Sequence, residues 1–165
     1  TMQITRKGVP TSIEGPFVEV GDMIPDFTLI DRENKEISSK DLIGKRLLIS
    51  VYPDINTSTC ERQTRTFFTR ASELEDIRIL NVSNNTVEEL NGWCATSGLN
   101  VDMTSDYNKS FEKGFGLYMP EFDVLARSIF IIDEKGKIEY MEIVQDMAVD
   151  PDYDKAIAVA NKKNV

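Results

Sequence analysis

The chain has 165 residues, of which 41% are hydrophobic and 28% charged, and this composition is typical of one water-soluble domain with a full hydrophobic core. Its net charge of −9 argues against binding to nucleic acid and to anionic membrane surfaces. No window is apolar enough to span a membrane, and the first residues lack the apolar core of a signal peptide. We therefore expect a cytoplasmic protein with a single domain over residues 1–165, and we interpret Thr1, which precedes Met2, as a remnant of expression.

Histidine is absent from the sequence, and this absence excludes several classes of site. Ser-His-Asp triads, Cys-His pairs and imidazole bases all need a histidine. The two cysteines alone cannot complete a structural zinc site. They also stand too far apart for the Cys-x-x-Cys motif of dithiol reductases. Any catalysis by this chain must therefore use thiols, carboxylates, hydroxyls or arginines.

Apolar residues alternate in some segments and recur every three or four positions in others, which predicts strands and helices respectively. In the first half of the chain we expect a hairpin within residues 1–20, a strand at 26–30, a buried central strand at 46–52, a helix at 60–75 and an apolar strand at 77–82. A helix capped by Asn85-Thr86 follows and carries Cys94, and after it come a short strand at 101–104 and a short helix at 109–115. The chain then forms a hairpin of 128–132 with 137–144 and a last helix that starts at Asp150-Pro151, with the proline in its first turn. Alternating strands and helices followed by an antiparallel pair predict an α/β fold with a mixed central sheet flanked by helices.

The segment around Cys60 is the most informative part of the chain. A strand-like run ends at Pro53, a short polar loop follows, and Cys60 then opens an amphipathic helix. A free thiol is mostly protonated at neutral pH, whereas a helix N-terminus stabilises a thiolate through its unpaired N–H groups and its dipole. Pro53, Thr57 and Cys60 together form the pattern Pro-x-x-x-Thr-x-x-Cys. The position of Cys60 at the start of a helix makes it a candidate nucleophile.

This pattern resembles the peroxidatic site of the peroxiredoxins, and nearly the whole chain is similar to their thiol peroxidase branch, the atypical two-cysteine peroxiredoxins. The supporting stretches are Val20-Gly21-Asp22, Pro25-Asp26-Phe27 and Pro151-Asp152-Tyr153-Asp154. The resemblance implies a thioredoxin-like fold with an added N-terminal β-hairpin. It also implies a homodimer, and it implies no metal, flavin or haem.

The resemblance further implies a role for each candidate site residue. Cys60 is the nucleophile that takes an oxygen atom from hydrogen peroxide or an organic hydroperoxide and becomes a sulfenic acid. Arg127 stabilises the thiolate, Thr57 hydrogen-bonds the peroxide, and Pro53 shields the thiolate from water. Cys94 resolves the sulfenic acid by forming a disulfide with Cys60 within one chain, and thioredoxin reduces that disulfide.

Each of these residues also has an ordinary structural interpretation. An isolated cysteine is most often a small buried hydrophobic residue, Thr57 can be a helix cap, and Arg127 can belong to a surface ion pair. If Cys94 is buried beside Trp93 and immobile, a one-cysteine mechanism applies instead. Two other functions stay open: a peroxide sensor with an identical site, and a non-catalytic binding module with an ordinary Cys60 thiol.

The chain differs from the usual family pattern at several positions. Asn56 stands where aspartate is usual, Thr59 where an aliphatic residue is usual, and Gly92-Trp93 where Arg-Phe is usual. The approach to Arg127 is shorter and contains less glycine than the family loop. These differences concern substrate preference, dimer geometry and helix unwinding rather than the peroxide chemistry itself.

Overall fold

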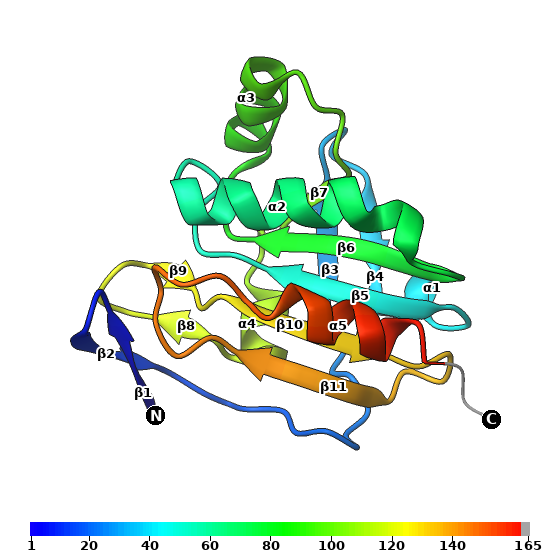
Figure 1. Ribbon diagram of the computed structural model, residues 1–165, viewed down its shortest axis with the longest axis horizontal. Helices are drawn as coiled ribbons and strands as arrows, with labels where there is room; N and C mark the ends of the chain where they lie inside the picture. The colour runs from blue at the N-terminus through cyan, green and yellow to red at the C-terminus, as the bar shows by residue number, and fades with distance from the viewer. Residues whose placement is uncertain (163–165) are drawn as a thin grey trace.

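The computed structural model describes residues 1–162 and is built around a mixed seven-stranded sheet (Figure 1). Residues 163–165, which belong to the predicted domain, lie outside the described residues. The strand order is β11-β10-β5-β6-β7-β3-β4, with β5, β6 and β7 parallel and every other neighbouring pair antiparallel. The strands are β3 (Thr28–Asp31), β4 (Glu36–Ser38), β5 (Arg46–Val51), β6 (Ile77–Ser83), β7 (Met103–Ser105), β10 (Ser128–Ile132) and β11 (Ile138–Ile143). The mixed α/β sheet that the sequence predicted is confirmed.

Two small antiparallel pairs lie outside the main sheet. β1 (Met2–Arg6) and β2 (Val9–Ile13) form the predicted N-terminal hairpin, and β8 (Tyr118–Met119) pairs with β9 (Val124–Leu125). The hairpin is tied to the loop after β11, because Thr5 N donates to Gln145 O at 2.9 Å and Met147 N donates to Thr5 O at 2.9 Å. The first and last parts of the chain are therefore joined at one side of the molecule.

Five α-helices complete the described part of the chain. They are α1 (Ser39–Leu42), α2 (Ser58–Arg70), α3 (Val87–Ser97), α4 (Ser110–Phe115) and α5 (Tyr153–Ala160). Both ends of α3 are fixed by local chemistry. Thr86 Oγ1 accepts from Glu89 N at 3.2 Å while the Glu89 carboxylate accepts from Thr86 N at 3.0 Å, which is a capping box. Gly98 ends the helix with a φ of 72°, a left-handed conformation that glycine adopts without a steric cost.

Two helix boundaries differ from the sequence predictions. The last helix begins at Tyr153 rather than at Pro151, because the Asp152 side chain accepts from Lys155 N and so caps the helix after the proline. The prediction that the proline lies in the first turn was therefore wrong. The helix predicted at 60–75 begins at Ser58 and gives way to a 3-10 turn, Ala71–Glu73, after Arg70. Cys60 consequently lies inside the first turn.

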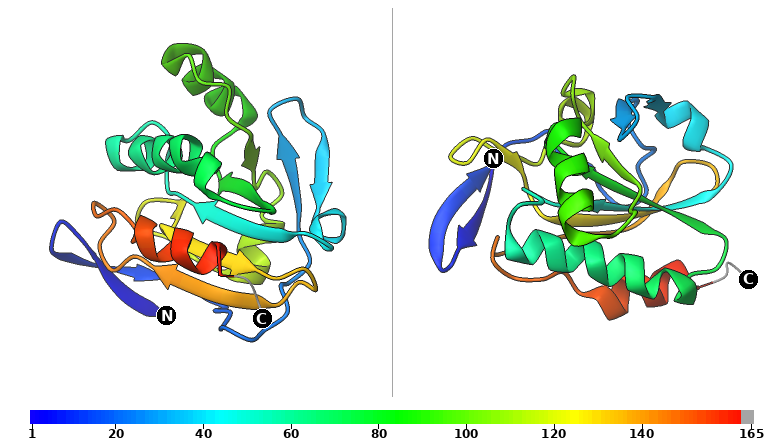
Figure 2. Two further views of the ribbon diagram at one scale, coloured as in Figure 1. Left: turned by 45° about the vertical axis from the view of Figure 1, so that its right-hand side comes forward. Right: turned by 90° about the horizontal axis from the view of Figure 1, so that it is seen from above.

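Helices cover both faces of the sheet. α2 and α5 lie side by side in front of the sheet in Figure 1, and α4 lies behind it. The front layer buries Phe67 and Ile157 against alternate strand residues such as Leu48, whereas α4 buries Phe111 and Phe115 on the opposite face. Figure 1 and the left view of Figure 2 show α3 standing above α2, outside the layer that α2 and α5 form. None of the helices within residues 1–162 combines the length and the hydropathy needed to cross a membrane.

Candidate active site

The candidate site is formed by the loop between β5 and α2, at the carboxyl end of a central strand. Pro53 follows the strand and cannot donate a ladder hydrogen bond, so the chain leaves the sheet there. Asn85, in the loop before α3, holds this segment in place. Its Oδ1 accepts from Ile55 N at 2.9 Å and its Nδ2 donates to Asp54 Oδ1 at 3.0 Å. The fixed loop then leads into α2, whose first turn contains Cys60.

The Cys60 thiol is buried and lies between two hydrogen-bond donors. Its residue is only 1% exposed. Sγ accepts from Asp54 N and from Arg127 Nη1, each at 3.4 Å. A guanidinium and a backbone N–H stabilise the anionic form of sulfur more than its neutral form. The structure therefore places Arg127 against the thiol in the way the sequence predicted, while the catalytic roles of both residues stay predictions.

Arg127 is held by a buried network of neutral groups. It is 2% exposed, so the alternative of a surface ion pair is wrong. Nη1 also donates to Gln63 Oε1 at 2.9 Å, and Nη2 donates to Met147 O at 2.7 Å. Gln63 Nε2 in turn donates to Ser50 Oγ at 2.8 Å. Gln63 was missed in the sequence, although its position one turn after the cysteine indicates the same helix face.

Thr57 and Pro53 lie at the entrance to the site. Thr57 is the residue before α2, but its side chain makes no capping bond to the helix. Instead its Oγ1 donates to Asp54 O at 2.8 Å, so Thr57 occupies the N-cap position without capping the helix through its side chain. Pro53 is buried beside it. Both residues line a cavity of about 380 Å³ together with Arg127.

The cavity combines apolar walls with two cations from the N-terminal hairpin. The remaining lining includes Arg6, Lys7, Phe122, Val124, Met147 and Ala148. Cys60 does not line the cavity itself, but its Sγ contacts Asp54 and Arg127, which do. A hydroperoxide in the cavity would therefore meet the guanidinium and the Thr57 hydroxyl beside the thiol.

Cys94 lies in the middle of α3 and shares an apolar cluster with Cys60. Both cysteines are free. Cys94 is 5% exposed, and its Sγ donates to Met103 Sδ at 3.7 Å. Burial raises the pKa of Tyr52 above its ordinary value, and the nearby Cys60 and Cys94 raise it further, so a neutral phenol lies close to both thiols. Each of the two cysteines lies on a helix, Cys60 on α2 and Cys94 on α3.

A thioredoxin-like sheet that holds a buried thiol at a helix N-terminus beside an arginine defines a class, the thiol-dependent oxidoreductases. The comparisons with known proteins narrow this class. The AhpC/TSA family matches residues 20–141. The chain is 39% identical over 160 residues to the thiol peroxidase of Bacillus subtilis (strain 168), covering 96% of each protein. It is 40% identical over 162 residues to the thiol peroxidase of Listeria innocua, covering 97% of this chain and 98% of the relative. The chain therefore belongs to the AhpC/TSA family.

Solved structures confirm the predicted fold. A peroxiredoxin-like protein from Aquifex aeolicus superposes with a TM-score of 0.88 at 24% identity, covering 96% of this chain and 95% of that protein. A thiol peroxidase from Chromobacterium violaceum gives a TM-score of 0.82 at 17% identity, again covering 96% of this chain and 95% of that protein. The family and the fold thus agree with the resemblance seen in the sequence.

Proposed function

We propose that the chain is a thiol peroxidase that reduces hydrogen peroxide and organic hydroperoxides with its own cysteines. The contact of 3.4 Å between Cys60 Sγ and Arg127 Nη1, buried next to a cavity, carries this proposal. Its relatives of about 40% identity carry the name thiol peroxidase, which supports the same activity. The geometry suits attack by sulfur on a small electrophile that enters from the cavity.

In the first step the Cys60 thiolate attacks the terminal oxygen of the hydroperoxide. An S–O bond forms, the O–O bond breaks, and the alcohol or water leaves after taking up a proton. Arg127 stabilises the negative charge on sulfur and then on the departing oxygen. The Thr57 hydroxyl hydrogen-bonds the peroxide, and Pro53 keeps water from the sulfur. Cys60 is left as a sulfenic acid.

In the second step the Cys94 thiol attacks the sulfenic sulfur. An S–S bond forms and the hydroxyl leaves as water, which gives an intramolecular disulfide. The presence of both free thiols in one apolar cluster supports this pairing. The first turn of α2 and the middle of α3 open during the step, which exposes the disulfide to a reductant.

Thioredoxin is the proposed reductant and a homodimer is the proposed assembly, both on the basis of the family resemblance. The chain mass is 18.7 kDa. Light scattering on a size-exclusion column should therefore give twice this mass at micromolar concentration. A mass equal to that of one chain would contradict the dimer and leave the peroxidase chemistry untouched.

A coupled assay tests the function. The protein is mixed with thioredoxin, thioredoxin reductase, NADPH and either hydrogen peroxide or cumene hydroperoxide. Hydroperoxide-dependent NADPH oxidation is expected for the wild type and is expected to vanish in Cys60→Ser. Slow reduction by thioredoxin together with a trapped mixed disulfide to another protein would favour the peroxide sensor instead.

A further inference from the structure

The helix that carries Cys94 is held to the body by few interactions. Only Leu90, Trp93 and Cys94 are buried among its 11 residues. Figure 1 shows α3 projecting at the top of the molecule, beyond the sheet. A helix with few buried apolar residues opens locally at a low free energy. The remaining tertiary contacts therefore have a large share in keeping it folded.

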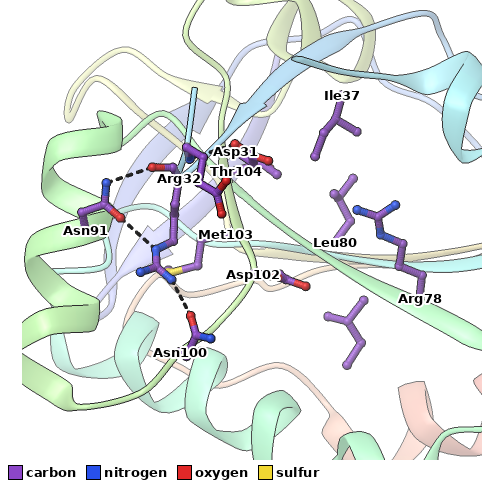
Figure 3. A pocket seen from close by; sticks show the side chains of 12 residues that line it. Asp31, Arg32, Ile37, Arg78, Leu80, Asn91, Asn100, Asp102, Met103 and Thr104 are labelled. Carbon is purple, nitrogen blue, oxygen red and sulfur yellow. Dashed lines mark hydrogen bonds between the residues drawn. The ribbon is translucent and has the colours of Figure 1, made fainter. Parts of the chain in front are cut away.

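Arg32 supplies a polar connection between this helix and the sheet. It lies in the turn between β3 and β4, and in Figure 3 its side chain reaches between Asn91 and Asn100. Nε donates to Asn91 Oδ1 at 2.9 Å, and Asn91 Nδ2 donates back to Arg32 O at 3.0 Å. Nη1 donates to Asn100 Oδ1 at 3.0 Å and to Val101 O at 3.3 Å. We call these four hydrogen bonds the Arg32 clamp.

The clamp brackets Cys94 along the chain. Asn91 lies on α3 one turn before Cys94, and Asn100 and Val101 lie just after the helix end at Gly98. One guanidinium thus fixes the segment on both sides of the thiol. The clamp residues Arg32, Asn91 and Asn100 also line a hollow of about 280 Å³, which is walled by Met103, the partner of the Cys94 thiol.

The partners of Arg32 are neutral. None of the ion pairs formed by residues 1–162 includes Arg32, whose acceptors are two amides and a carbonyl. Arg32 is half-buried, and water can replace its amide acceptors when the segment moves away, so the clamp can release without leaving a buried unpaired charge. Hydrogen bonds to neutral acceptors can therefore hold α3 in place and still allow it to open.

We propose that Arg32 is a positioning residue that holds α3 folded in the reduced protein and so sets how fast Cys94 reaches the oxidised Cys60. This inference rests on the proposed function, in which Cys94 is the resolving thiol. The Cys60 sulfenic acid has two fates. It condenses with the Cys94 thiol and releases water, or a second hydroperoxide adds one oxygen to give a sulfinic acid and leaves as its alcohol or water. A clamp that slows opening shifts this partition toward the sulfinic acid.

The test compares Arg32→Met with wild type. Methionine keeps much of the apolar stem of the side chain and removes the three hydrogen bonds that the guanidinium donates, while the bond from Asn91 Nδ2 to the backbone carbonyl of residue 32 can remain. Arg78→Met is the matched control, because Arg78 is exposed and lines the same hollow. Arg32→Lys is the conservative variant, since its ammonium can donate to one amide but cannot donate to Asn91 and Asn100 together as the guanidinium does. Two readouts are taken: hydrogen exchange of the α3 amides in the reduced proteins, and the ratio of disulfide to sulfinic acid by intact mass under excess cumene hydroperoxide.

The clamp predicts that α3 amides exchange roughly tenfold faster in Arg32→Met, since charge-assisted hydrogen bonds are lost, while α5 amides are unchanged. The ratio of disulfide to sulfinic acid should rise by about the same factor. The exchange rates and the ratio in Arg32→Lys should lie between those of wild type and Arg32→Met, and those of Arg78→Met should match wild type. Equal ratios in wild type and Arg32→Met would overturn the inference, as would equal exchange of α3.

Failure of the proposed function gives a different result. If Cys94 is not the resolving thiol, neither wild type nor Arg32→Met forms a disulfide, and both accumulate oxygen on Cys60. The role of Arg32 in catalysis would then be wrong as well. Exchange of the α3 amides would still decide whether the clamp holds the helix.

Discussion

At the scale of single residues, Arg127 brings a positive charge to the Cys60 sulfur. No ion pair within residues 1–162 includes this arginine, whose acceptors are the Gln63 amide, the Met147 carbonyl and the Cys60 sulfur. A carboxylate partner would cancel much of the field at sulfur, whereas neutral acceptors orient the guanidinium and leave its charge. In the proposed mechanism this charge stabilises negative charge on sulfur and on the peroxide oxygen.

Replacing Arg127 by glutamine should slow oxidation of Cys60 by about 10²–10³-fold, which is the usual cost of removing one well-placed donor to a developing anion. Arg127→Lys should be faster than Arg127→Gln but slower than the parent, because lysine keeps the positive charge but not the several fixed donors of the guanidinium. The measurement is sulfenic acid formation in the Cys94→Ser background by rapid quench and intact mass. A rate for Arg127→Gln within about twofold of the parent would contradict this account of the site.

Gln63 should matter for both stability and reactivity. Gln63→Met removes the oxygen acceptor of Arg127 Nη1 and leaves this nitrogen the Cys60 sulfur, and an under-satisfied buried group costs about 1–3 kcal/mol. We expect a lower free energy of unfolding in urea and slower oxidation of Cys60, since Arg127 loses its anchor. Gln3→Met, at an exposed position of β1, is the control. Full stability and full reactivity in Gln63→Met would show that the Met147 carbonyl alone orients the arginine.

The residues that the sequence revealed are those with unusual chemistry in a characteristic order. Pro53, Thr57 and Cys60 are close in the chain, and the structure places them around one loop. Gln63 carries no comparable signal, because a glutamine on an amphipathic helix is normally a solvated residue. Gln63 is 0% exposed, and it is buried against Arg127, which comes from the link between β9 and β10.

At the scale of elements, one carboxylate adds several hydrogen bonds to the backbone contacts that hold the N-terminal hairpin. Asp146, in the loop after β11, accepts from Thr5 Oγ1 at 2.6 Å, from Lys7 N at 3.1 Å and from Gly8 N at 3.0 Å. The bond from Thr5 and those from backbone N–H groups hold the pKa of the Asp146 carboxyl well below its ordinary value. Because the hairpin brings Arg6 and Lys7 to the cavity, this carboxylate also shapes the entrance.

The lowered pKa predicts a pH dependence for hairpin docking. A carboxyl whose pKa is lower in the folded state stabilises it fully above the ordinary value of about 3.9 and loses this contribution as the pH falls below that value. The hairpin amides should therefore exchange faster, relative to those of β5, as the pH is lowered from about 5 to 3. Asp146→Asn should show fast hairpin exchange at both pH values. A wild-type ratio that does not change with pH would contradict the role of this carboxylate.

The long elements were predicted from the sequence, and several of the shortest ones were not. The apolar strand at 46–52 and the helix carrying Cys94 have clear periodicity. β4, α1, β8 and β9 have two to four residues each, which is too short to show the repeating apolar pattern of a strand or a helix. Pro151 was placed inside a helix because proline favours first turns, but Asp152 offered a side-chain cap one residue later and determined the start.

At the scale of the whole molecule, strand pairing assembles the site. β10 runs antiparallel to β5 with Ser128 opposite Val51, so Arg127 arrives next to the loop that follows β5. Cys60 comes from the following helix, and Met147 from the loop after the neighbouring strand β11. The class of fold was predictable from alternating elements, whereas the contact between Cys60 and Arg127 depended on this register. Without the family resemblance, nothing in the sequence would have selected Arg127 from the other arginines.

The measurement that tests the central claim most directly is the intact mass of the reduced protein after an equimolar amount of cumene hydroperoxide, with Cys60→Ser and Cys94→Ser measured beside it. The account predicts a rapid loss of about two mass units in wild type, from two thiol hydrogens, and a gain of about sixteen in Cys94→Ser, from one oxygen. Cys60→Ser should not change. A wild-type mass that stays constant over minutes would contradict the peroxidase mechanism and leave a binding module with a buried, unreactive thiol.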